Sequence, residues 1–197
     1  MRTFIFGLAM LASAGAQAAT VSTTLQAGGL LGVTFELGAG ASFLDLTTNG
    51  STYVGDGGRA DTVIGLFDGT APGASLIGSD DDNGDLFLSF LTFGPSDRVP
   101  AGADAGPRAA GVPGAGTYTL VVTGFPTPLG ASAELGRLGR SGEDRAIDIS
   151  LNIASDAAIT NVVFAPIVPV PLPATGGLLG GAVALFGLSR LLRRRNA

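Results

Sequence analysis

Short apolar runs separated by glycine-rich breaks constrain this chain more than any other feature of its sequence. Each run has the length of a strand, and several alternate apolar with small or polar residues, as Val33, Phe35 and Leu37 do. No helical period is sustained, and 32 glycines among 197 residues suit tight turns. We therefore predict an all-β fold, an antiparallel β-sandwich of about eight strands. The runs are LLGVTFEL, SFLDLTT, DTVIGLFDG, ASLIGS, LFLSFLTF, GTYTLVVTGF, RAIDISLNI and TNVVFAPI.

The N-terminus has the three parts of a secretory signal peptide. Arg2 supplies a positive charge, residues 4–11 form a short apolar stretch, and Ala16-Gln17-Ala18 matches the small-residue cleavage pattern. We predict a signal helix over residues 1–18 with Ala16 and Ala18 at its cleavage site. The mature chain would then begin at Ala19, and the sandwich would occupy residues 19–165.

The middle of the chain is acidic and lacks several reactive side chains. All sixteen acidic residues lie there, whereas five of the eleven arginines lie in the two terminal segments, which argues against nucleic acid as a partner. Histidine, cysteine and lysine are absent, which excludes Ser-His-Asp and Cys-His catalysis, His-ligated zinc, thiolate metal sites and Schiff-base chemistry. Carboxylates, hydroxyls and backbone oxygens remain, and these are ligands suited to calcium.

The stretch SDDDNGD, residues 79–85, concentrates negative charge. Its aspartates repel one another unless a cation or backbone N–H groups offset the charge, so we predict a calcium site. The spacing is not that of an EF-hand, because Leu91 occupies the twelfth loop position. A polar hairpin tip is the alternative, since Asn83-Gly84 between apolar runs is a strong two-residue turn signal. The candidate ligands are Asp80, Asp81, Asp82, Asn83 and Asp85, with Asp61 and Asp68 as distant members.

Two stretches interrupt the strand pattern. Residues 94–116 are rich in Gly, Pro and Ala and predict a long mobile loop. Residues 124–145 predict a second irregular connection, whose charged end, Glu143-Asp144-Arg145, indicates a solvated turn.

The sequence around the acidic turn resembles the bacterial pre-peptidase C-terminal domain and its secreted relatives. The shared features are Asp61 before a strand, Phe67-Asp68-Gly69 at its end, the acidic turn, and the later strand that opens with residues 115–118. The resemblance covers residues 25–155 and implies a jelly-roll-like sandwich that in some relatives binds calcium, and in some binds matrix polymers or helps secretion. In the later strand, Tyr118, Leu120 and Val122 alternate with the other residues, which places them inward.

The C-terminal residues combine a proline-rich segment, an apolar run and an arginine cluster. As a helix, residues 176–192 would span roughly 25 Å, close to the roughly 30 Å of a membrane core. The arginines that follow would stay cytoplasmic. We predict a proline-rich sorting segment at 166–175, a transmembrane helix at 176–192 and a basic tail at 193–197.

The proline-rich segment carries the motif VPLPA, made by Val170, Pro171, Leu172, Pro173 and Ala174. It resembles the exosortase-type sorting tails of the PEP-CTERM system. The resemblance implies that a membrane transpeptidase or protease cuts near the motif and passes the protein to the cell surface or an exopolysaccharide matrix. The overlapping LPATG, residues 172–176, fits the pattern of Gram-positive sortase substrates, and this alternative stays open.

These features predict an exported, non-enzymatic cell-surface or extracellular-matrix protein. An exosortase-type enzyme would process an inner-membrane precursor, and Ca²⁺ is the expected cofactor. One alternative is a carbohydrate- or matrix-binding module, with Tyr53, Asp45 and Asn49 as candidate residues. Another is a hydrolase with two carboxylates in a cleft, one of raised pKa, although no sequence pattern identifies such a pair.

Overall fold

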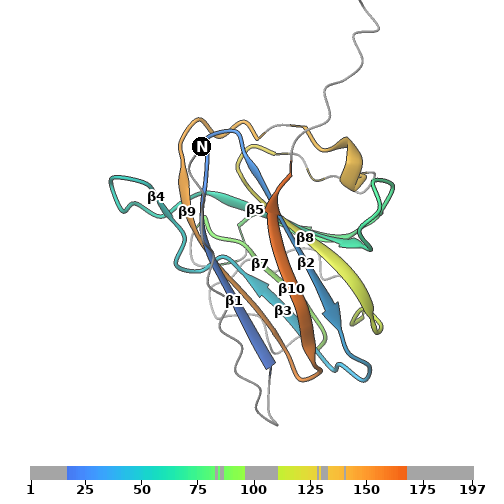
Figure 1. The fold of residues 1–197 in the computed structure, drawn as a ribbon. Helices are drawn as coiled ribbons and strands as arrows, with labels where there is room; N and C mark the ends of the chain where they lie inside the picture. The colour runs from blue at the N-terminus through green and yellow to red at the C-terminus, as the bar shows by residue number, and fades with distance from the viewer. Residues whose placement is uncertain are drawn as a thin grey trace, which may run out of the picture.

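The computed structural model describes residues 17–82, 84, 87–95, 111–127, 129, 133–139 and 141–167. In these residues the fold is all-β, with two five-stranded antiparallel sheets and one short 3-10 helix (Figure 1). The first sheet has the order β1-β9-β3-β7, with β4 also paired to β9, and the second has the order β10-β2-β8-β5-β6. The elements are β1 (Gln17–Leu25), β2 (Leu30–Leu37), β3 (Leu44–Thr47), β4 (Thr52–Tyr53), β5 (Thr62–Asp68), β6 (Leu76–Asp80), β7 (Phe90–Phe93), β8 (Gly116–Gly124), η2 (Leu135–Arg137), β9 (Ile147–Ser155) and β10 (Ile159–Pro166).

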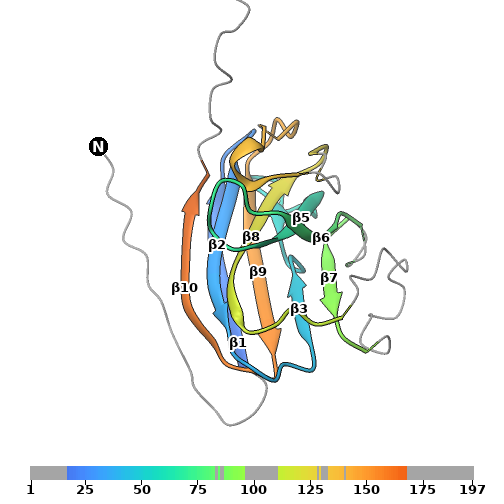
Figure 2. The same ribbon diagram turned by 90° about the vertical axis from the view of Figure 1, so that its right-hand side faces the viewer.

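The main hydrophobic core lies between the two sheets. Figure 2 shows the layers from the side, with β10 at one edge of its sheet and β7 at the far side of the molecule. The alternation predicted in the sequence is confirmed, because Val33 and Phe35 of β2 are fully buried and meet Ile149 and Leu151 of β9 in one cluster. Fully burying a side chain of this size contributes roughly 1.5–3 kcal/mol, so the inward rows hold the sandwich together.

Each of the eight predicted runs contains one strand, but two strands were not predicted. Strand β1 pairs with β9 from Gln17↔Ser155 onward, ahead of the predicted domain start at Ala19. Only Val21 and Leu25 are buried among its nine residues, so its apolar pattern is weak. Strand β4 has two residues, too few for any period. The described structure therefore has two strands more than the predicted eight. Both were missed because a polar edge strand and a two-residue strand carry little hydrophobic signal.

Strand β8 is buried on both faces. Tyr118, Leu120 and Val122 point into the main core, as predicted. On the opposite face Val121 belongs to a second cluster, which Leu129 and Leu138 from the irregular 124–145 connection help to cover. This connection is therefore a partial third layer over the outer face of the second sheet.

Several predicted features fall on residues outside the described ranges. These are most of the signal peptide, including Ala16, the centre of the long loop at 96–110, the sorting motif, and the transmembrane helix and basic tail. Ala18, the other predicted cleavage-site residue, lies in β1 opposite Ala154. Among the described residues, no helix has both the length and the apolar character needed to span a membrane.

Candidate functional site

The acidic turn of residues 79–85 connects two strands that belong to different sheets. Strand β6 pairs with β5, whereas β7 pairs with β3. A two-residue hairpin joins strands that pair with each other, so the hairpin alternative for Asn83-Gly84 is wrong. Gly84 donates its N–H to the carbonyl of Leu88 at 2.6 Å, and a Cβ at this position would come within 2.3 Å of that oxygen. The glycine therefore permits a close backbone approach within the crossover.

Asp80 is buried at the start of this crossover and has a structural partner. The residue is only 6% exposed, and its Oδ2 accepts a hydrogen bond from the backbone N–H of Phe90 at 2.8 Å. The carboxylate thus joins the end of β6 to the start of β7 across the gap between the sheets. A charge-assisted bond of this kind is worth roughly 1.5–3 kcal/mol, so Asp80 has a structural role whether or not a cation is bound.

Three buried hydroxyls fix the crossover to the body of the sandwich. Thr48, Thr62 and Ser89 are fully buried. The hydroxyls of Thr48 and Thr62 are 2.6 Å apart, and the Ser89 N–H donates to Thr48 Oγ1 at 2.9 Å. The Ser89 hydroxyl donates to the Thr62 carbonyl at 2.6 Å. The carbonyl of Asp81 lies 3.3 Å from the same hydroxyl and is its second acceptor. This network couples the acidic turn to the residue that follows Asp61.

Asp61 lies beside the acidic turn and is the least satisfied carboxylate in the described part of the chain. Its Oδ1 is buried without a hydrogen-bond partner among the described residues. Burial, and then the negative charges of Asp82, Asp81 and Glu143, raise the pKa of the Asp61 carboxyl to about 6. Asp61 therefore lies close to the aspartates with which the sequence analysis grouped it, and a cation there would offset their mutual repulsion.

A second polar cluster surrounds Tyr53 and contacts Asp61. The Tyr53 hydroxyl donates to Glu143 Oε2 at 2.8 Å and accepts the Asp61 N–H at 3.3 Å. The Arg145 guanidinium lies 3.6 Å from the centre of the Tyr53 ring and forms an ion pair with Asp56. The predicted solvated turn at 143–145 is thus held against β4.

This arrangement bears on the carbohydrate-binding alternative. One face of the Tyr53 ring is covered by Arg145, and the side chain also packs against the main core, which favours a structural role over a sugar-stacking platform. Asp45 accepts a hydrogen bond from Thr92 across the β3–β7 pair. Asn49 lies against Gly84 in the crossover. Each of the three candidate residues therefore contacts other residues of the protein itself.

Asp68 is separated from the other candidate ligands. Asp61 immediately precedes β5 and Asp68 ends it, so the two lie roughly 20 Å apart along an extended strand. Asp68 cannot share one ion with Asp61. Within the described ranges, no group of three or more His, Cys, Asp or Glu side chains is arranged to hold a metal ion, and Asn83 and Asp85 lie outside those ranges. The observed link between Asp61 and the turn is that the charges of Asp82 and Asp81 help to raise the pKa of the Asp61 carboxyl.

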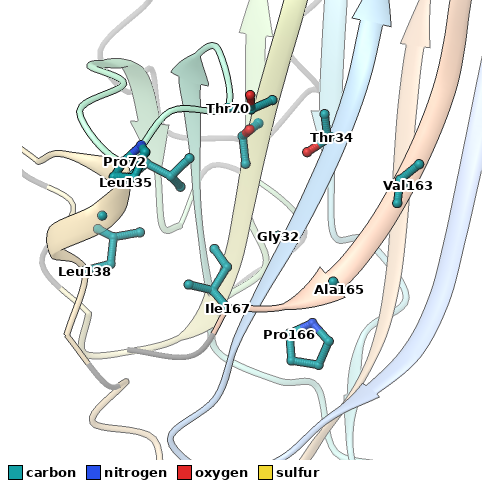
Figure 3. Close-up of a pocket in the computed structure, with 12 residues that line it drawn as sticks. Gly32, Thr34, Thr70, Pro72, Leu135, Leu138, Val163, Ala165, Pro166 and Ile167 are labelled. Atoms are coloured by element: carbon teal, nitrogen blue, oxygen red, sulfur yellow. The ribbon is translucent and has the colours of Figure 1, made fainter. Parts of the chain in front are cut away.

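A groove of about 340 Å³ lies over the outer face of the second sheet (Figure 3). Gly32 and Thr34 of β2 form part of its floor, and β10 forms one side. Pro72 and Leu135 stand on the other side, where the irregular connection covers β8 and β5. None of the residues that line it is charged, and Asp61 is not among them.

Sequence reasoning missed the groove, the hydroxyl network and the Tyr53 cluster. Each depends on residues far apart in the chain, such as Tyr53 and Glu143, which are 90 positions apart. Only a prediction of strand pairing could have brought them together. In comparisons with models of protein families and with curated proteins, nothing matched this chain.

Proposed function

We propose that this protein is an exported, non-enzymatic surface or matrix protein whose C-terminal motif is processed by an exosortase-type enzyme. One observation carries the proposal. Both sheets are built from residues up to Pro166, while the VPLPA motif begins at Val170. Cutting near the motif would therefore leave every described strand and the core intact, as a displayed domain requires.

The finer fold assignment belongs to the same proposal. We infer a jelly-roll-like sandwich related to the pre-peptidase C-terminal domain. The strand orders support it, since most connections cross from one sheet to the other, the exceptions being β3 to β4 and β5 to β6, and give β1-β9-β3-β7 opposite β2-β8-β5-β6. Strand β10 is then an addition at the edge of the second sheet, beside β2.

A non-catalytic role is favoured by where the acids lie. A carboxylate hydrolase needs an acid of raised pKa in a cleft that admits substrate. Asp61 has the raised pKa, but the groove is lined by uncharged residues and lies over a different face. The acid of raised pKa and the groove therefore lie in different places. Among the described residues, this favours a displayed, non-catalytic protein over a hydrolase.

Calcium is the proposed cofactor at the Asp61 end of the sandwich. The proposal is supported by the unpartnered, buried Oδ1 of Asp61 and by the neighbouring charges of Asp81 and Asp82. Carboxylates and backbone carbonyls are the ligands that calcium takes, and a cation would remove the repulsion among these groups. Its proposed role is to stiffen the crossover between β6 and β7.

The test of processing is the intact mass of the protein recovered from the surface of its native cells. We expect a mass that ends between Pro173 and Thr175, and we expect it to be lost in a strain without the sorting enzyme. The final residue distinguishes an exosortase-type cut from a sortase cut within LPATG. A mass that still includes Arg195 would contradict the proposal, because the protein would then keep its C-terminal tail.

A further inference from the structure

The groove marks the boundary between a covered and an uncovered half of the second sheet's outer face. Across the strands, Val163 pairs with Thr34, and Thr34 pairs with Thr119, so these three form one outward row. Val163 is 63% exposed at the β10 end of that row, whereas Thr119 is 4% exposed at the β8 end. An exposed apolar residue on a sheet face, next to a part of that face that other segments already cover, is typical of a place where a further segment packs.

The side chain of Ile167, the last described residue of the chain, lies in this groove. Ile167 donates its N–H to the Leu30 carbonyl at 2.8 Å, which continues the β10–β2 pairing by one residue. Its side chain crosses over Gly32, where a Cβ would come within 3.0 Å of Ile167 Cγ1, and packs against the second cluster. Figure 3 shows Ile167 in the middle of the lining, between the β10 side and the side formed by Leu135 and Leu138. The described chain therefore ends within the lining of the groove.

The segment that follows has the chemistry that such a groove accepts. Residues 168–174, VPVPLPA, carry no charge, and three of the seven are prolines without an N–H. Burying this backbone against an uncharged surface leaves few donors unsatisfied, which keeps the cost of desolvation low. In the polyproline conformation seven residues extend roughly 22 Å, enough to run the length of a groove of this size.

We propose that residues 168–174 dock in the groove and that the sandwich itself thereby holds its sorting motif. The lining that the segment would meet includes Pro72, Leu135 and Leu138, with Val163 on the β10 side. Access of a processing enzyme to the motif then requires release of the segment. This last consequence rests on the proposed function, whereas the docking itself does not.

The absence of cysteine from the sequence permits a direct test in the purified full chain. A Thr70→Cys substitution places the chain's single thiol at the groove, where Thr70 is an exposed lining residue. The rate at which this thiol reacts with a polar maleimide is measured in two proteins. In one, residues 168–174 are unchanged, and in the other they carry both Val170→Asp and Leu172→Asp. We expect at least a threefold faster reaction with the two aspartates, because charged residues should not dock on the uncharged lining. Ser22→Cys is the matched control, since Ser22 is exposed on β1 of the other sheet.

The outcomes separate the candidate occupants of the groove. A faster rate for the thiol at the groove, with an unchanged rate for the control thiol on β1, would support docking of the segment. Equal rates for the groove thiol in both backgrounds, or the same change at both thiols, would overturn it. Shielding of the groove thiol that disappears on dilution would assign the groove to a second copy of the chain and would also overturn it. None of these readings requires a sorting enzyme, so docking can fail while the proposed processing stands.

Discussion

Asp61 carries the strongest local conflict in the described sandwich. Its carboxylate is partly buried beside other carboxylates, and one oxygen has no partner among the described residues. Because the pKa of about 6 lies above the usual 3.8, folding favours the protonated form. The stabilisation that protonation gives is present below pH 3.8 and is lost as the pH rises through about 6.

The free energy of unfolding without calcium should therefore fall between pH 5 and pH 7.5. The shift alone corresponds to about 3 kcal/mol, but solvent screens a carboxylate that is only partly buried, so we expect about 1 kcal/mol. Urea unfolding in the presence of a chelator measures it. In Asp61→Asn this contribution should vanish. If the free energy of unfolding of that variant fell with pH as steeply as before, other groups would be producing the pH dependence.

The acids with lowered pKa act in the opposite direction and at lower pH. Hydrogen bonds from the side chain and backbone of Ser42 lower the pKa of Asp156 below its ordinary value. That stabilisation is present above the unfolded pKa of about 3.8 and is lost as the pH falls through the depressed folded value. Keeping the comparison above pH 5 therefore isolates the contribution of Asp61.

Calcium should stabilise the protein at neutral pH through the same residue. A ligand at ten times its dissociation constant adds about 1.4 kcal/mol, which raises the melting temperature of a domain of this size by roughly 3–6 °C. We expect this increase in the unchanged protein and in Asp68→Asn, because Asp68 lies at the far end of β5. Asp61→Asn should lose it. An equal increase in both variants would place any bound calcium elsewhere.

The β6–β7 crossover depends on the buried hydroxyls that contact it. A Ser89→Ala substitution removes the hydroxyl that contacts the carbonyls of Thr62 and Asp81. Leaving buried acceptors without their donor costs roughly 1–3 kcal/mol, so we expect the free energy of urea unfolding to fall by that amount. Ser22→Ala, on the exposed side of β1, should change it by less than about 0.5 kcal/mol. Similar effects of the two substitutions would show that the network adds no stability.

The elements also show how far the sequence could lead. Strands β2 and β9 could be predicted because each buries alternate apolar residues, and β8 because it combines β-branched residues with Tyr118. Strand β1 could not, because its two buried residues lie within a polar stretch that follows the predicted signal peptide. The same limit applies to the site. The acidic residues could be identified one by one, but the proximity of Asp61 to the turn depends on how β5, β6 and β7 are arranged in space.

The hydrophobic core that the two sheets share implies one cooperative unfolding transition. One cluster contains residues of both sheets, so neither sheet can lose its partner without exposing its own inward face. The chain contains two tyrosines and no tryptophan, which supplies one fluorescent reporter for each sheet. Tyr53 lies in β4 of the first sheet and Tyr118 in β8 of the second.

We expect the fluorescence of each tyrosine to change at the same urea concentration as the circular dichroism of the backbone. In a protein of residues 17–167, Tyr118→Phe leaves Tyr53 as the fluorescent probe and Tyr53→Phe leaves Tyr118. Each substitution removes a hydroxyl hydrogen bond, so the fluorescence midpoint of each variant is compared with the circular dichroism midpoint of that same variant. Coincident midpoints in both variants follow if the sandwich unfolds as one unit. A tyrosine signal that changes at lower urea than the dichroism in one variant would mean that its sheet opens first, and the shared core would then not be what couples the two layers.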